Sequence, residues 1–213
     1  MAQSSNRVDI KKLSLEFELI FSAYHEASHT VMGLLNYIMI PEVEIFNTND
    51  NRVEGFTHYE DFTTQDPDIL LFLVKSEILT NYSGFLAEKN LYKHICGRTN
   101  LPMVLKAGSS SDMINSSDLI RKHNLASAGK ERSTYVQKMM REAAKMVEFY
   151  WEDITLVAHA LCEKNKLNFD DLKKILNKSS KKDFWKKRFK LLVKIYNTAA
   201  PLEDRDLRHI LLL

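Results

Sequence analysis

The sequence predicts a mainly α-helical protein of the α+β class, with one small β-sheet. Of its 213 residues, 45% are hydrophobic and 27% charged, and there are only 6 Gly and 4 Pro. A composition poor in helix breakers, with apolar residues recurring every three or four positions over long stretches, favours helices. In one stretch, residues 43–59, two short β-type runs flank a polar turn. This pattern predicts a strand hairpin.

The first half of the chain is predicted to contain two helices separated by this hairpin. Residues 13–36 contain no Pro and have apolar side chains at helical spacing, and Pro41 lies beyond their end. The strands are expected at 43–47 and 52–59, joined by the polar sequence TNDN. Asp66 followed by Pro67 is a helix-start signature, because the carboxylate caps free N–H groups and Pro has none to lose. The second helix is expected to reach about His94.

The second half is predicted to be helical after a loop over residues 97–108. Serines 109–111 can cap a short helix over 112–124, which places Asp112 in its first turn. Residues 133–164 predict one long amphipathic helix, in which apolar positions recur at threes and fours with one interval of seven. Asn168 can cap a helix over 169–176, and residues 181–196 predict a basic amphipathic helix.

Charge and cysteine content narrow the classes of function. The net charge of +2 does not favour a nucleic-acid-binding protein. Cys96 and Cys162 form no CxxC pair, which suits a reducing compartment. No apolar run approaches the ~20 residues that span a bilayer, and the first residues have no apolar signal region. We therefore expect a cytoplasmic protein without a membrane span.

The sequence AYHEASHTVMG, residues 23–33, contains an HExxH motif. On a helix His25 and His29 share one face, so both imidazoles can bind one tetrahedral Zn²⁺ while Glu26 lies beside them as general base and acid for a zinc-bound water. With this histidine and glutamate content, only ~0.02 such motifs are expected by chance. The sequence predicts a zinc-dependent metallopeptidase helix.

A catalytic zinc needs a third protein ligand. The metzincin extension of the motif is absent, because Met32 and Leu35 stand where it requires Gly and His. Two acidic candidates remain. Asp112 can present a carboxylate from the first turn of a capped helix, although acids are common there for helix stability alone. Glu88 is the alternative ligand, or a residue that orients a ligand imidazole.

Four segments in the same order resemble the peptidase domain of FtsH-type ATP-dependent zinc metalloproteases. They are AYHEASHTVMG, VEIFNTNDNRVEGFTHYE, YSGFLAEKNLYKHICG and AGSSSDMINSSDLIRKHN. The resemblance implies a helical zinc-peptidase domain over residues 1–178, with a small sheet beside the HExxH helix, and Asp112 as the third ligand. It also implies that Gly55, Phe56 and Thr57 border the substrate groove. Ser28 departs from the family's Gly, and residues 179–213 form a basic helical extension.

No GxxxxGK[ST] phosphate-binding loop is present in the sequence, so we expect no ATPase motor in this chain. We therefore expect a metalloendopeptidase that hydrolyses peptides or unfolded proteins, either unassisted or with a separate ATPase, in a monomer or a homo-oligomer. The alternative is a non-catalytic scaffold with the peptidase fold that binds partners, or nucleic acid, through its basic tail. For that tail, a solvated basic face behind an apolar stripe is favoured over nucleic-acid binding.

Overall fold

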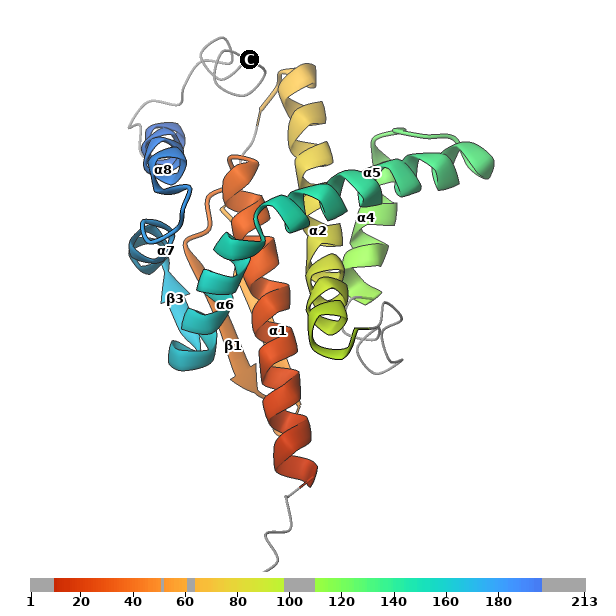
Figure 1. Cartoon of the computed structure of the whole chain (residues 1–213). Helices are drawn as coiled ribbons and strands as arrows, with labels where there is room; N and C mark the ends of the chain where they lie inside the picture. Colours follow the sequence, from red (N-terminus) through yellow and green to blue (C-terminus); the bar gives the residue numbers. More distant parts are fainter. Residues whose placement is uncertain (1–9, 51, 61–63, 98–109, 197–213) are drawn as a thin grey trace, which may run out of the picture.

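The computed structural model describes residues 10–50, 52–60, 64–97 and 110–196, with side chains from residue 15 onward. Seven helices and three strands lie in these ranges (Figure 1). The strands form a single antiparallel sheet in the order β2-β1-β3. The predicted fold class, mainly helical with a small sheet, is confirmed.

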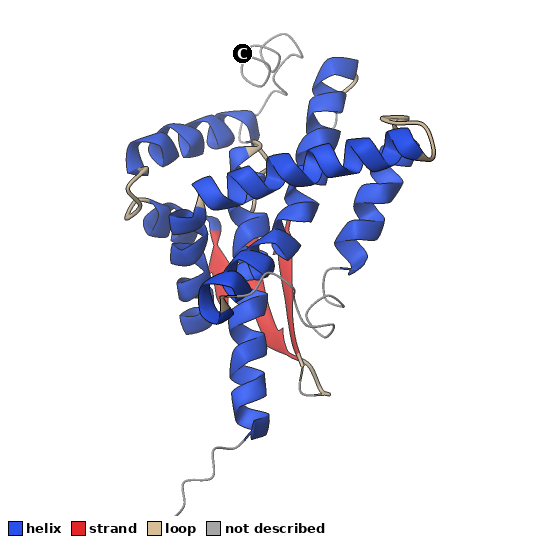
Figure 2. Ribbon diagram, turned by 45° about the vertical axis from the view of Figure 1, so that its right-hand side comes forward, coloured by secondary structure: helices blue, strands red, loops and turns tan. Residues whose placement is uncertain are grey.

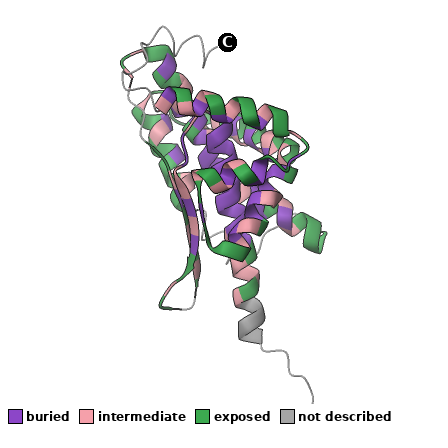
Figure 3. Cartoon of the chain, turned by 90° about the vertical axis from the view of Figure 1, so that its left-hand side faces the viewer, coloured by how far each residue is buried: buried purple, intermediate pink, exposed green. Residues whose placement is uncertain are grey.

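Helix α1 (Ile10–Leu35) is the central element of the fold. It runs antiparallel to α2 (Pro67–Cys96) and also packs against α6, β1 and β2 (Figure 1). Its residues from 23 onward are almost all buried, with Ala23, Ala27 and Val31 fully so (Figure 3). A helix that is apolar around most of its circumference must be covered on all sides. The HExxH motif therefore lies inside the molecule and not on its surface.

The sheet packs beside α1 (Figure 2). Strand β1 (Glu42–Asn47) pairs with β2 (Val53–His58) in the predicted hairpin and with β3 (Lys166–Asn168) on its other side. Val43 and Ile45 face the core, as the two-residue period of a strand requires. The hairpin prediction is confirmed, whereas β3 was not predicted. Within the described residues, β2 has a strand neighbour on one side only.

Helix α2 begins and ends where its caps predict. The Asp66 carboxylate accepts hydrogen bonds from the backbone N–H groups of Asp68 and Ile69, and Gly97 ends the helix in a left-handed conformation. By length and composition α2 can cross a membrane, but half of its most apolar window is buried inside the described part of the molecule. The absence of a membrane span stays a prediction.

The prediction of one long helix over residues 133–164 is wrong in one respect, because the structure has two helices that are divided at Tyr150. Helix α5 (Lys130–Phe149) and helix α6 (Trp151–Lys164) meet there at an angle (Figure 1). α5 packs mainly on α2, whereas α6 packs on α1. Most of the apolar stripe of α5, including Met139 and Ala143, is buried in one cluster, whereas Val147 near its end joins the cluster that buries the stripe of α6. The interval of seven between Val147 and Ile154 spans this break.

The remaining helices lie near the predicted positions. Helix α4 (Ser110–Lys122) follows the segment 98–109, which contains most of the expected loop and lies outside the described residues. Asn168 caps α7 (Phe169–Leu176) with a reciprocal capping box. Helix α8 (Lys182–Tyr196) buries Trp185 and Phe189 in the same cluster as α1. The domain boundary at residue 178 stays a prediction, and residues 197–213 lie outside the described ranges.

Candidate metal centre

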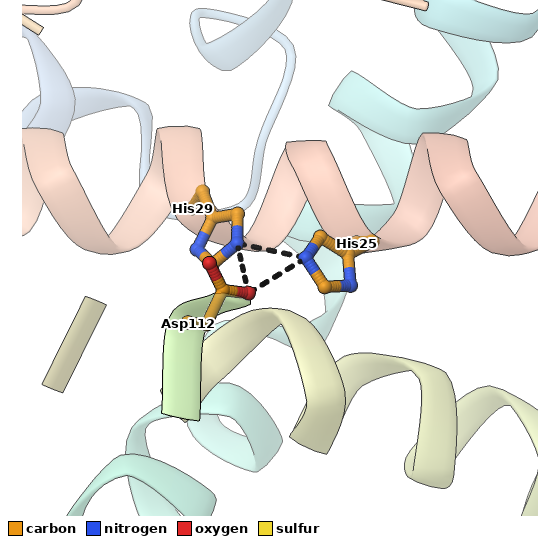
Figure 4. A group of neighbouring side chains, drawn as sticks. All are labelled: His25, His29 and Asp112. Carbon is orange, nitrogen blue, oxygen red and sulfur yellow. Dashed lines mark hydrogen bonds and ion pairs between the residues drawn. The ribbon is translucent and has the colours of Figure 1, made fainter. Parts of the chain in front are cut away.

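Two histidines and one aspartate bring three ligand atoms together between α1 and α4 (Figure 4). The Nε2 atoms of His25 and His29 lie 2.9 Å apart, and Asp112 Oδ2 lies 3.1 Å from the first and 3.2 Å from the second. His25 and His29 are separated by one helical turn, and Asp112 is in the first turn of α4. The structure therefore joins the HExxH pair to an acid 83 residues farther along the chain.

Hydrogen bonds at the far side of each imidazole determine which nitrogen carries the proton. His29 Nδ1 lies 2.8 Å from the Thr80 carbonyl oxygen, and a carbonyl can only accept, so Nδ1 donates. His25 Nδ1 lies 2.7 Å from Glu88 Oε1 and donates to that carboxylate in the same way. A neutral imidazole with a protonated Nδ1 presents a bare lone pair at Nε2. Both Nε2 lone pairs therefore point at the Asp112 carboxylate.

Three lone pairs this close together repel one another unless a cation lies among them. In the metal-free protein that cation is a proton. Burial alone would lower the pKa of His25, but hydrogen bonds to Asp112 and Glu88 outweigh it and hold this pKa well above its usual value. Burial likewise would raise the pKa of Asp112, but the two histidines hold it far below its usual range. The site attracts positive charge strongly.

The donor set and its spacing fit zinc. Zn²⁺ bound tetrahedrally at ~2.0–2.1 Å holds its ligands about 3.3 Å apart, close to the observed separations of 2.9, 3.1 and 3.2 Å. Two imidazoles and one carboxylate are also a typical catalytic zinc set, which leaves the fourth position open. The side chains of His25, His29 and Asp112 are only 10%, 6% and 17% exposed, so competition from bulk water is small.

Glu88 contacts the candidate ligand His25 and is not one of the three candidate ligand residues. Its carboxylate is buried on α2 and bonds the Nδ1 edge of His25, on the opposite side of the ring from Nε2. Of the two roles left open by the sequence, the geometry corresponds to orienting the imidazole. A carboxylate in this position fixes the tautomer and makes Nε2 a better donor to a metal.

Gly84, which the sequence analysis did not single out, leaves space beside both imidazoles. A Cβ atom at this position would lie 2.5 Å from His25 Nε2 and 2.7 Å from His29 Nε2. A glycine in the middle of a helix costs about 1 kcal/mol of stability relative to alanine. An isolated glycine inside a predicted helix such as α2 therefore indicates a position with a packing or functional reason for having no side chain. Ser28, the departure from the resembling family, is accommodated because its hydroxyl donates to the Ser83 carbonyl at 3.1 Å.

The strand β2 holds Glu26. Thr57 Oγ1 donates to Glu26 Oε2 at 2.7 Å, and a Cβ at Gly55 would overlap the Glu26 side chain. Both residues were expected to border a substrate groove, which stays a prediction, and both lie against the expected general base. Phe56, the third expected groove residue, points away from them and is 55% exposed.

A second group of metal-type side chains lies on the outer face of the sheet. Glu42, Glu44 and His58 approach one another there. Lys166 already bonds Glu42 at 2.6 Å and Glu44 at 3.4 Å, so its ammonium supplies the positive charge. This group is a surface ion-pair network on partly exposed strands.

Helix α8, which lies in the predicted basic tail, has an apolar inner face, as the sequence predicts. Residues 169–196 contain ten basic and three acidic side chains, a net charge of +7 in a chain of +2. Lys182, Lys186, Lys187 and Lys190 are exposed. Arg188 instead packs its guanidinium 3.6 Å from the ring centre of Tyr37, where it supports the docking of α8.

Comparison with protein-family models gave no match to this chain, and comparison with curated proteins gave none either.

Proposed function

We propose that this chain is a zinc-dependent metalloendopeptidase of the FtsH-peptidase type. The observation that carries the proposal is the convergence of three lone pairs, two from the HExxH histidines and one from Asp112, next to the carboxylate of Glu26. Ordinary structural histidines do not need two bare Nε2 atoms 2.9 Å apart with a carboxylate against both. The ordered resemblance of four segments to FtsH-type peptidases supports the same assignment.

His25, His29 and Asp112 would hold the metal. Zinc bound there would supply a Lewis acid that activates water near neutral pH. Glu88 and the Thr80 carbonyl keep both rings in the tautomer that presents Nε2. His25 and His29 are buried and the Asp112 side chain is only 17% exposed, which limits competition from bulk water and strengthens each electrostatic interaction.

Glu26 would move the proton. Thr57 occupies Oε2, which leaves Oε1 to accept a proton from the attacking water and to deliver it to the amine that leaves. The bond from Thr57 also limits rotation of the carboxylate, and Gly55 provides the space in which it lies. The chain therefore fixes the base before substrate arrives.

The substrate class proposed is a peptide or an unfolded protein segment in extended conformation. The edge of β2 that has no strand neighbour among the described residues can pair with such a segment directly beside Glu26. A separate ATPase would be needed to unfold folded substrates, and a cytoplasmic location with no membrane span remains part of the proposal.

The test is hydrolysis of unfolded casein and of short peptides by the zinc-loaded chain, with Glu26→Gln as the matched variant. Wild type is expected to cleave and Glu26→Gln to lose at least about 100-fold in kcat/KM while keeping zinc. Equal rates in the two proteins would show that a contaminant cleaves, and the enzyme proposal would be withdrawn.

A non-catalytic scaffold is the second candidate, and the net charge of +7 over residues 169–196 is the observation that favours it. Such a scaffold would bind zinc without cleaving any peptide and would bind an acidic partner with strong salt dependence. Nucleic acid is not the expected partner, because two of these lysines, Lys173 and Lys186, are paired with acids of the same helices.

A further inference from the structure

Helix α8 has a row of lysines on its exposed face, which we call the lysine stripe. Its members are Lys182, Lys186, Lys187, Lys190 and Lys194, and all five are exposed. At about 100° of rotation per residue they lie within an arc of about 140° of the helix surface, and the row is about 18 Å long. The buried residues of α8, such as Trp185 and Leu192, lie on the opposite side. The charges of the stripe therefore face away from the core.

The lysine stripe has few acidic partners within the molecule. Asp183 is the only acid in α8, and its carboxylate lies 3.5 Å from the ammonium group of Lys186. No ion pair joins the other four lysines to an acid in the described part of the chain. Like charges four residues apart on a helix repel each other and destabilise it. The stripe therefore does not help α8 to form.

Other side chains hold α8 on the molecule. Trp185 Nε1 donates a hydrogen bond of 2.7 Å to Asp153, and the guanidinium of Arg188 packs 3.6 Å from the ring centre of Tyr37. Phe189 and Leu192 are buried in the same cluster as α1. The stripe is thus not needed for docking, and its charges remain available to a partner.

An exposed aromatic ring lies at the N-terminal end of the stripe. Phe149 is 65% exposed, more than any other large hydrophobic residue in the described ranges. The ammonium group of Lys181, which directly precedes the stripe, lies 5.1 Å from the centre of this ring. A phenyl ring gains free energy when it leaves water. Phe149 is therefore a second observation, independent of charge, that indicates a partner at this end of α8.

A lipid bilayer with anionic headgroups satisfies both observations. A cluster of four to eight basic residues on an amphipathic helix attracts anionic lipids, and aromatic rings are favoured at the level of the headgroups. A nucleic acid satisfies them less well, because arginine is the preferred residue for its phosphates and bases. The only arginine in α8 is Arg188, which packs on Tyr37.

We propose that the lysine stripe and Phe149 bind the surface of an anionic membrane. The lysines contact the lipid phosphates, and the Phe149 ring enters the headgroup region. The apolar face of α8 stays buried in the protein core, so the helix lies on the bilayer and does not enter it. Helices α8 and α4 lie on opposite sides of the molecule, so the membrane is far from Asp112 (Figure 1). This inference does not depend on the peptidase function.

The test is cosedimentation of the full chain with sucrose-loaded vesicles. One set contains phosphatidylcholine alone, and the other also contains about 30% phosphatidylserine. We expect binding to the anionic vesicles to be at least about 100-fold tighter at low salt, and most of this difference to be lost at high salt because the charges are screened. Measurements with zinc and with a chelator are expected to agree, because the metal centre takes no part.

Two variants separate the contributions of the stripe and of the ring, each with circular dichroism to confirm folding. Glutamine at positions 182, 186, 190 and 194 is expected to weaken binding to anionic vesicles at least about 30-fold. The matched control has glutamine in place of four exposed lysines of α4 and α5, Lys122, Lys130, Lys138 and Lys145. It has the same net charge and should stay within about threefold of wild type. Phe149→Ala is expected to weaken binding about tenfold, whereas Ile95→Ala, at a 54% exposed residue of α2, should not.

Equal binding to the two kinds of vesicle would overturn the proposal. Equal losses in the stripe variant and in its charge-matched control would also overturn it, because net charge alone would then explain the attraction. Tighter binding to a short DNA duplex than to anionic vesicles at the same salt would assign the stripe to nucleic acid instead. Unchanged binding of Phe149→Ala would overturn the entry of this ring into the bilayer.

Discussion

Replacing Gly84 by alanine adds one methyl group beside the two histidines that form the metal centre. The new Cβ would lie 2.5 Å from His25 Nε2 and 2.7 Å from His29 Nε2. Non-bonded heavy atoms are comfortable at about 3.5 Å, so one partner must move by about 1 Å. The atoms that must move are the two proposed ligand atoms, because the methyl group is fixed to the helix backbone.

This displacement is large compared with what a metal site tolerates. Functional metal sites keep ligand distances within about 0.2 Å of ideal values. We therefore expect Gly84→Ala to weaken zinc binding by at least about 100-fold, equivalent to about 2.7 kcal/mol. The metal-free protein is expected to keep its fold, because alanine favours a helix by about 1 kcal/mol over glycine and offsets part of the strain.

The assay is a zinc titration against a competing chelator, with circular dichroism to confirm that each variant folds. Gly33→Ala is the matched control, since it makes the same change on α1 one turn beyond His29. Its Cβ would meet the flexible end of Ile40 at 2.8 Å and no ligand atom, so zinc affinity should stay within about threefold of wild type. Zinc affinity of Gly84→Ala equal to that of wild type would refute the placement of the metal.

Four further predictions concern the groups around the centre and the docking of α8. Thr57→Val is expected to keep zinc but to lower kcat about tenfold, whereas Thr57→Ser should keep most activity, measured by peptide hydrolysis. Glu88→Gln should weaken zinc binding about 10–100-fold without unfolding the protein, measured by the same titration; unchanged affinity would contradict its role in orienting the imidazole. The pKa of His25 is higher in the metal-free fold than in the unfolded chain, where it is about 6.5. Protonated His25 therefore stabilises the fold fully at a pH below the unfolded-chain pKa, and this stabilisation is lost as the pH rises through the folded-state pKa. Melting temperature with a chelator should therefore fall as pH rises above about 6.5, whereas zinc-loaded protein should not show this loss, and parallel pH profiles would argue against the site. Trp185→Phe removes the 2.7 Å hydrogen bond to the fully buried Asp153 carboxylate and should cost about 1–3 kcal/mol of unfolding free energy in urea titrations, with zinc content unchanged.

Local signals in the sequence were sufficient for most of the fold. Caps, turn residues and apolar periodicity lie within a few positions of the elements they define, as Asp66 and Asn168 illustrate. Strand β3 was missed because its three residues, the last of which is the Asn168 cap of α7, have no pattern of their own and are ordered by pairing with β1. The break at Tyr150 was missed because it depends on which cluster each half of the helix meets.

The candidate site also contains some residues that local sequence patterns predict and others that depend on how the helices pack. The HExxH helix is a local pattern, so its two histidines and Glu26 could be placed on one helix from spacing alone. Asp112 was one of two acidic candidates, and the resemblance favoured it over Glu88, since no local rule relates either residue to α1. The contacts of Gly84 and of the Thr80 carbonyl depend on how α2 packs against α1, and sequence spacing does not encode that packing.

The metal content of the purified chain tests the central claim most directly. Wild type, His29→Ala and Asp112→Ala would be purified without a histidine tag, confirmed as folded, and analysed by elemental mass spectrometry after dialysis against trace zinc. About one zinc per wild-type chain, lost in both variants, is the predicted result. Wild-type protein that binds no zinc even after reconstitution would contradict the metal centre and the peptidase proposal with it.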